Sequence, residues 1–143
     1  MQRAAFLAGA AFTRSYVGYV HALAHALGGT YNVPHGYANA VLLPHVLKAY
    51  GKKAYGRLAY LSDMLHLLPP GSAKKEKAEA FIAYVEGLNE AMGIPPGFKD
   101  VVKEEEDILA LCLHAAKEGN PLYPVPKIMN AKELEIVLRS SLL

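Results

Sequence analysis

Apolar residues recur along this chain at helical spacing, in blocks separated by glycine and proline. Residues 2–27 contain no proline and carry apolar residues all round, which predicts a helix buried on most sides. Gly28-Gly29 should end it, and a short connector should lead into a second helix over 35–49. Because Pro44 lies inside this second block, we expect a kink or break around 41–44.

The remainder of the chain continues the helical pattern. Three more helices are predicted over 53–68, 73–92 and 103–118. Asn130 with Glu133 three residues later resembles a capping box, which opens a last helix to the C-terminus. The segment 123–128 is the β-like exception, and it contains two prolines. The fold class predicted is therefore all-α, with residues 1–143 forming one helical domain.

Charged side chains are unevenly distributed along these helices. The 33 residues from Ser15 to Leu47 contain no Lys, Arg, Asp or Glu, and no acid precedes Asp63. Glycines, a proline and histidines interrupt this uncharged run, so it predicts deep burial rather than a membrane span. The start "MQRAAFLAGAAF" has some features of a signal peptide, but its small-residue pattern continues onward, which favours a helix.

Composition narrows the class of protein further. With 52% hydrophobic and 20% charged residues and a net charge of +2, the chain is typical of a soluble globular protein, with neither nucleic acid nor membrane as a partner. Cys112 is the single cysteine, so no internal disulfide or Cys-x-x-Cys metal site is possible, and a cytoplasmic location fits best. Since no glycine-rich phosphate loop follows a strand, we expect no dinucleotide site within the chain itself.

Three histidines near the end of the first predicted helix are the main candidates for chemistry. His21 and His25 are four residues apart, so they project from one helix face. His35 follows the Gly-Gly turn, and the connector is short enough to bring it back toward them. The spacing permits a shared metal or catalytic site, but it equally permits ordinary hydrogen-bonded core histidines.

The other histidines have simpler interpretations, and the neighbourhood lacks acids. His45, directly after Pro44, is expected to pack or cap, while His66 and His114 are expected to be structural or exposed. A divalent cation held by neutral imidazoles alone would be poorly compensated, because iron and zinc commonly add a carboxylate. Either a distant acid such as Asp63 folds in, or the missing ligand is not encoded in this chain.

One long run carries a resemblance to a known family. "AFTRSYVGYVHALAHALGGTYNVPHGYANAVLLPHVL", residues 11–47, contains His-x-x-x-His-x-Leu-Gly, Pro-His-Gly-x-Ala-Asn-Ala and Leu-Pro-His. It closely resembles the signature of the iron-containing alcohol dehydrogenases, and the likeness extends through "EGNPLYPVPKIM" (118–129). The implied fold is a helical bundle, most of the C-terminal domain of the dehydroquinate synthase-like, iron alcohol dehydrogenase fold.

The resemblance also implies a chemistry and a role for each histidine. Family members interconvert alcohols and aldehydes or ketones by hydride transfer with NAD(P), using Fe²⁺, in some members Zn²⁺, as a Lewis acid. Of the family's four metal ligands, two fall here on His21 and His35. His25 falls on a site histidine that is not a primary ligand, and substrate contact or proton relay is its implied catalytic role.

The chain also departs from the family pattern. The resemblance implies that it begins inside the helical domain, without the nucleotide-binding domain and the Asp-x-x-x-His pair that completes the metal shell. The alternatives are a fragment, a truncated reading frame or one piece of a split protein, and we expect no activity from the chain alone. A stand-alone helical module that binds metal or oligomerises without catalysis is the other hypothesis. Exposed apolar surface should favour a homo-oligomer, with residues 1–27 against a second copy.

Overall fold

The computed structural model describes residues 1–99, 101–102 and 105–142, and within them the chain is entirely helical. The elements are α1 (Gln2–Ser15), α2 (Tyr19–Tyr31), α3 (His35–Tyr50), the short 3₁₀ helix η1 (Gly51–Lys53), α4 (Tyr55–Met64), α5 (Lys74–Ala91), α6 (Glu105–Gly119) and α7 (Ala131–Ser140). No strand occurs among the described residues, which confirms the all-α prediction.

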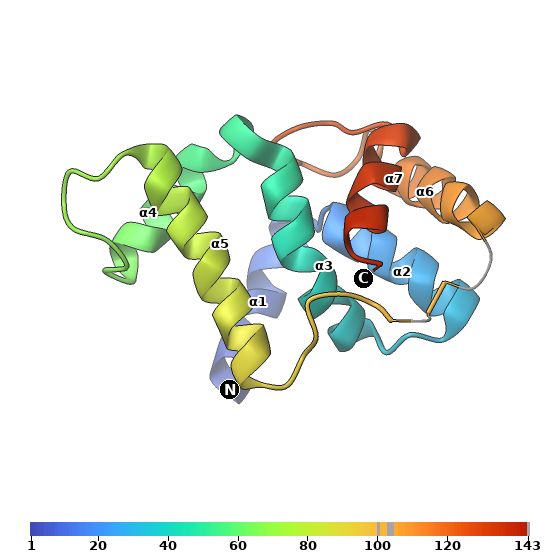
Figure 1. Ribbon diagram of the computed structural model, residues 1–143, viewed down its shortest axis with the longest axis horizontal. Coiled ribbons are helices and arrows are strands. Elements are labelled where there is room, and N and C mark those ends of the chain that lie inside the picture. The colour runs from blue at the N-terminus through green and yellow to red at the C-terminus, as the bar shows by residue number, and fades with distance from the viewer. Residues whose placement is uncertain (100, 103–104, 143) are drawn as a thin grey trace.

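Helix α2 packs between two other helices. It contacts α3 on one side and α6 on another, while α7 packs against α6 and α3 (Figure 1). Helices α4 and α5 pack against each other, and α5 also contacts α3. Leu23 and Leu27 of α2 are fully buried, as expected from the uncharged sequence. Helix α2, which carries His21 and His25, is therefore held by one helix that directly follows it, α3, and by one from the later part of the chain, α6.

The prediction of one buried helix over residues 2–27 is wrong in two respects. The chain breaks between α1 and α2, where Tyr16 has a left-handed φ of 57° and Gly18 is extended. A Cβ added at Gly18 would lie 3.4 Å from Val125 Cγ1 and 3.5 Å from the Tyr50 hydroxyl, so distant segments of the chain lie within van der Waals reach of this glycine. Helix α1 has no buried residue, and Tyr16 just after it is 66% exposed, contrary to the predicted burial of this segment.

The end of α2 also differs from the prediction that Gly28-Gly29 stops the helix. Both glycines are accommodated as helical residues, and α2 continues to Tyr31. Asn32 then takes the left-handed conformation with φ of 55°, and its N–H donates to the Gly28 carbonyl at 3.0 Å. Asparagine tolerates this conformation better than other side chains except glycine, so it serves as the C-terminal cap.

Helix α3 passes through Pro44 without the break predicted around 41–44. Proline has no N–H to donate to the carbonyl four residues before it, which is that of Ala40. Asn89 of α5 donates its side-chain amide to this Ala40 carbonyl at 2.8 Å, and Asn89 is itself buried. A neighbouring helix thus satisfies the carbonyl that proline leaves unpaired.

The remaining helices follow their sequence patterns more closely. Helix α4 ends at Met64, earlier than the predicted 68, and α5 matches its prediction within one residue at each end. The start predicted for the next helix, at 103, lies outside the described residues; α6 is described from Glu105. The capping box is confirmed, since the Asn130 side chain accepts from Glu133 N and Glu133 accepts from Asn130 N, both at 3.0 Å. Among the described helices, none is both long and apolar enough to cross a membrane.

Candidate metal and catalytic site

The structure brings the three predicted histidines together. The ring centroids of His21 and His35 are 5.3 Å apart, those of His25 and His35 are 5.2 Å apart, and those of His21 and His25 are 5.9 Å apart. The rings of His25 and His35 are nearly parallel, at 19°. We call these three residues the histidine cluster.

Two helices and the turn between them build this cluster. His21 and His25 are one helical turn apart on α2, so they share a face. The cap at Asn32 ends α2, the connector 32–34 reverses the chain, and buried Val33 anchors it to the core. His35 is the first residue of α3, so the reversal places its ring over the face that carries the other two.

Burial and neighbouring rings favour the neutral form of His21. Burial lowers the pKa of His21, and the nearby His35 and His25 lower it further, while Glu118 opposes the change. A neutral imidazole has a lone pair on one ring nitrogen, which is the form that binds metals or accepts a proton. In His35, the side-chain amide of Asn39 donates to Nε2 at 2.9 Å, so that lone pair is already used in a hydrogen bond.

The sequence analysis did not predict that an acid, Glu118, reaches the histidine cluster. Glu118 Oε1 lies 2.8 Å from His25 Nδ1, and the Tyr123 hydroxyl donates to the same oxygen at 2.6 Å. Glu118 is 93 positions from His25, so no local spacing connects them. One signal was available: an acid in the last turn of a helix is disfavoured by the helix dipole, which suggests a tertiary partner.

The donor set fits a bound metal in part. Imidazole nitrogens suit Fe²⁺ and Zn²⁺, and His21 and His35 face each other across the cluster. Glu118 is engaged by His25 and Tyr123, and within the described part of the chain no group of three or more His, Cys, Asp or Glu side chains is arranged to hold a metal ion. The cluster therefore offers part of a coordination shell.

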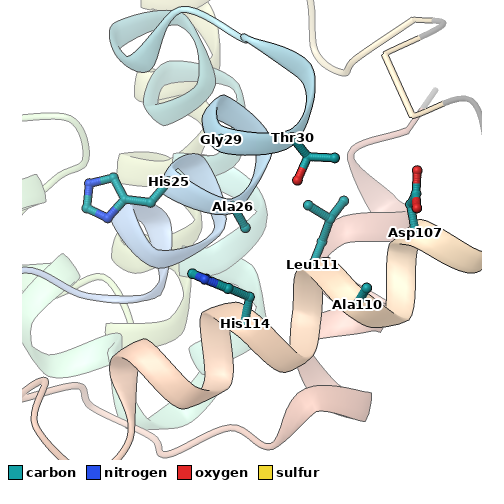
Figure 2. A pocket seen from close by; sticks show the side chains of 8 residues that line it. All are labelled: His25, Ala26, Gly29, Thr30, Asp107, Ala110, Leu111 and His114. Carbon is teal, nitrogen blue, oxygen red and sulfur yellow. The ribbon is translucent and has the colours of Figure 1, made fainter.

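A pocket of about 380 Å³ adjoins the cluster between α2 and α6. Its lining residues are His25, Ala26, Gly29, Thr30, Asp107, Ala110, Leu111 and His114. Figure 2 shows His25 at its edge, with the ring directed away from Leu111 and Asp107 on α6. His25, the catalytic candidate, thus belongs both to the histidine cluster and to the lining of this pocket.

The other residues considered from the sequence lie elsewhere. Asp63 does not fold into the cluster, because its carboxylate pairs with Lys77 Nζ at 2.6 Å between α4 and α5. His45 does pack as predicted, with Nε2 at 2.8 Å from the Pro96 carbonyl and Nδ1 at 3.0 Å from Ser140 Oγ. His114 is exposed on α6, as expected, whereas His66 lies in the turn after α4 with φ of 53° rather than within a helix.

Comparison with known proteins places this geometry in a family. A profile described as "Fe-containing alcohol dehydrogenase family, C-terminal" matches residues 1–142. The 1,3-propanediol dehydrogenase of Klebsiella pneumoniae is 36% identical over 141 residues, covering 99% of this chain and 36% of that protein. Alcohol dehydrogenase 4 of Saccharomyces cerevisiae is 44% identical over 121 residues, covering 81% of this chain and 29% of the relative.

Solved structures agree with the sequence relatives. The alcohol dehydrogenase from Oenococcus oeni superposes with a TM-score of 0.85 at 32% identity, covering 94% of this chain and 35% of that one. The chain thus spans about a third of the length of these relatives. A helical fold that matches this part of those enzymes, together with the profile match along the chain, identifies the family: the chain belongs to the iron-containing alcohol dehydrogenases and corresponds to their C-terminal part.

Proposed function

We propose that these residues work within an iron-dependent, NAD(P)-linked alcohol dehydrogenase that interconverts small alcohols with aldehydes or ketones. The observation that carries this proposal is the convergence of three imidazoles from α2 and α3, with ring centroids 5.2 to 5.9 Å apart. Relatives whose names specify alcohol dehydrogenase, 1,3-propanediol dehydrogenase and lactaldehyde reductase support the substrate class.

Within that enzyme, the chain's histidines divide the work. His21 and His35 would hold the metal, His35 exchanging its hydrogen bond from Asn39 for the metal bond. When bound, iron supplies a Lewis acid that polarises the substrate oxygen and NAD(P) supplies the hydride carrier. His25 lies beside His21 and His35. We assign His25 two roles, contact with the substrate and relay of the proton of the alcohol.

The 143-residue chain by itself should lack this activity. By the family resemblance, two of four metal ligands, His21 and His35, would lie in its histidine cluster, and the described residues include no strand that could form a nucleotide-binding sheet. Addition of Fe²⁺ and NAD(P)H to the purified chain should therefore give no reduction of a short aldehyde. Turnover at a normal dehydrogenase rate, abolished by a chelator, would contradict this part of the proposal.

Metal binding tests the histidine roles directly. The chain should bind Co²⁺, a spectroscopic substitute for Fe²⁺, weakly, with a visible absorption band that His21→Ala and His35→Ala both remove. His66→Ala is the matched control, because His66 lies in the turn after α4, outside the histidine cluster. Equal binding by all four proteins would refute a site at His21 and His35 and leave a helical module without metal chemistry.

We also propose that the chain self-associates through α1. Its apolar side chains Phe6, Leu7 and Phe12 are 75%, 57% and 49% exposed, and a second copy offers an identical face. Light scattering at micromolar concentration should show a homo-oligomer that Phe6→Glu dissociates. A monomer would contradict this proposal without affecting the metal site.

A cytoplasmic location also remains a proposal, supported by the single cysteine.

A further inference from the structure

We propose that Glu118 is a positioning residue for His25: its carboxylate, anchored by Tyr123, fixes the imidazole as the tautomer with hydrogen on Nδ1 and leaves the lone pair on Nε2. The functional part of this inference rests on the role proposed above for His25. The tautomer itself is a property of this chain and can be measured without activity. Neither Glu118 nor Tyr123 belongs to the histidine motifs in the sequence.

The tautomer follows from which atoms can donate. The distance from His25 Nδ1 to Glu118 Oε1 is 2.8 Å, a normal hydrogen-bond length. A carboxylate has no hydrogen to donate, so Nδ1 must carry the shared hydrogen. A neutral imidazole has one N–H, and the remaining lone pair therefore lies on Nε2. A proton acceptor for the alcohol needs such a lone pair at a defined atom.

Tyr123 holds the carboxylate in the orientation that this bond requires. Its hydroxyl donates to the same oxygen, Glu118 Oε1, at 2.6 Å. Burial and the hydrogen bond to Glu118 raise the pKa of Tyr123 to about 12, so the phenol keeps its hydrogen at neutral pH and remains a donor. One oxygen thus receives two hydrogen bonds, which restricts rotation of the carboxylate.

The backbone around Glu118 is fixed to the helix that carries His25. A Cβ added at Gly119 would lie 2.9 Å from Tyr19 Cε1, so the end of α6 touches the start of α2 closely. The buried Tyr19 hydroxyl accepts from Met129 N at 2.9 Å and donates to the Asn120 side chain. Tyr19 is six positions before His25 on the same helix, so the acid and the imidazole share one rigid frame.

The simpler interpretation is an ordinary surface ion pair, and its consequences differ. The His25 side chain is 44% exposed and the Glu118 side chain is 23% exposed, so their pairing should stabilise the fold only slightly. Positioning predicts a large change in the tautomer together with this small change in stability. An acid in the last turn of α6 is also unfavourable for the helix dipole, so local structure does not account for Glu118.

Nitrogen NMR of the histidine side chains tests the proposal on the whole chain. The spectrum would be recorded about two pH units above the ordinary imidazole pKa of about 6.5, with His25 assigned from a His25→Gln variant. In the wild type, His25 should show a protonated Nδ1 and an unprotonated Nε2. In Glu118→Ala, the Nδ1–H form should fall from the dominant to the minor component, because free imidazole in histidine favours Nε2–H.

Two further variants separate positioning from general damage. Glu118→Gln should keep the Nδ1–H form, because the amide oxygen can accept the same bond. Glu90→Ala removes an exposed acid on α5 and should leave the His25 spectrum unchanged. If Glu118→Ala does not fold, Tyr123→Phe keeps the acid, removes its anchor, and should give a mixture of tautomers.

The outcomes distinguish this inference from the proposed function. An Nε2–H tautomer in the wild type, or no change in folded Glu118→Ala, would overturn the positioning role. The expected tautomer shift, combined with full activity of His25→Gln in the longer enzyme, would leave positioning intact and remove the proton-relay function. Loss of activity in His25→Gln, combined with no tautomer shift in Glu118→Ala, would support the proton relay by His25 and overturn the positioning role of Glu118.

Discussion

Helices α1 and α2 were predicted from the sequence as one buried helix, yet they have opposite environments. Both are rich in alanine and apolar residues, and neither contains an acid. Six residues of α2 are buried between α3 and α6, whereas α1 has none. In Figure 1, α2 lies among the other helices and α1 lies at the far side, running to the N-terminus.

The difference shows that helical pattern and burial are separate properties. Alanine-rich sequence favours a helix wherever it occurs, because alanine loses little entropy on becoming helical. Burial requires complementary surfaces from elsewhere, and α2 receives them through Tyr19, whose hydroxyl bonds to Asn120 and Met129. His21 and His25 of the histidine cluster lie on the helix that has these partners.

The largest difference in stability should appear when a leucine is replaced by alanine in α2 and, separately, in α1. Leu23→Ala removes a fully buried side chain from α2 and should lower the free energy of unfolding by about 2 to 5 kcal/mol, because it leaves a cavity. Leu7→Ala, at a position 57% exposed on α1, should change it by about 0.5 kcal/mol or less. Urea unfolding measures both. Equal losses would show that α1 is packed in solution.

The Tyr19 anchor should have the next largest effect. Tyr19→Phe keeps the buried ring but removes the acceptor for Met129 N–H, which lies 2.9 Å from the hydroxyl oxygen. Leaving a buried N–H unpaired should destabilise the protein by about 1 to 3 kcal/mol. Tyr16→Phe, on a residue 66% exposed, is the control and should have little effect. Thermal unfolding of both would reveal whether the hydroxyl matters.

Two glycines should respond to alanine with opposite signs. Gly119→Ala places a methyl group 2.9 Å from the fixed Tyr19 ring and should destabilise the protein by about 1 to 3 kcal/mol. Gly9→Ala, within exposed α1 and with no atom within 4 Å of the added methyl, should raise helix stability by about 0.5 to 1 kcal/mol. Circular dichroism during denaturation reports both. Destabilisation by Gly9→Ala would reveal an unseen neighbour of α1.

The smallest change in stability should come from ionisation of the Cys112 thiol. Burial raises the pKa of Cys112 to about 12, whereas the unfolded chain should ionise near the ordinary value of about 8.5. At that ordinary value the unfolded state is half ionised while the native thiol keeps its proton, so stability should be lower there by about 0.4 kcal/mol than at neutral pH. Iodoacetamide should react slowly with Cys112 and at a free-thiol rate with Ala8→Cys in a Cys112→Ala chain. Fast labelling of native Cys112 would refute its burial.

Several parts of the fold could be predicted because their causes are local. The capping box at Asn130 and Glu133 involves residues three apart, and the structure contains both of its hydrogen bonds. The stripe of apolar residues over 73–92 predicted α5 closely for the same reason. The approach of His35 to His21 was also accessible, since helical spacing and a short connector limit where the ring can lie.

The predictions that were wrong depended on distant residues. Helix α3 passes Pro44 because Asn89 from another helix bonds the carbonyl that proline leaves unpaired. The first predicted helix breaks near Gly18, and the residues beside that glycine, Val125 and Tyr50, come from distant parts of the chain. Residues this far apart in sequence leave no periodic signal, so pattern and propensity cannot reveal such contacts.

The sequence by itself determined the all-helical class, most of the helices and the proximity of the three histidines, because periodicity and spacing act within a few turns of chain. The tertiary structure alone decided which helices are buried and which acid faces the cluster. Glu118 is 93 positions from His25, and their contact exists because α6 packs against α2. Packing, rather than local preference, therefore completed the site.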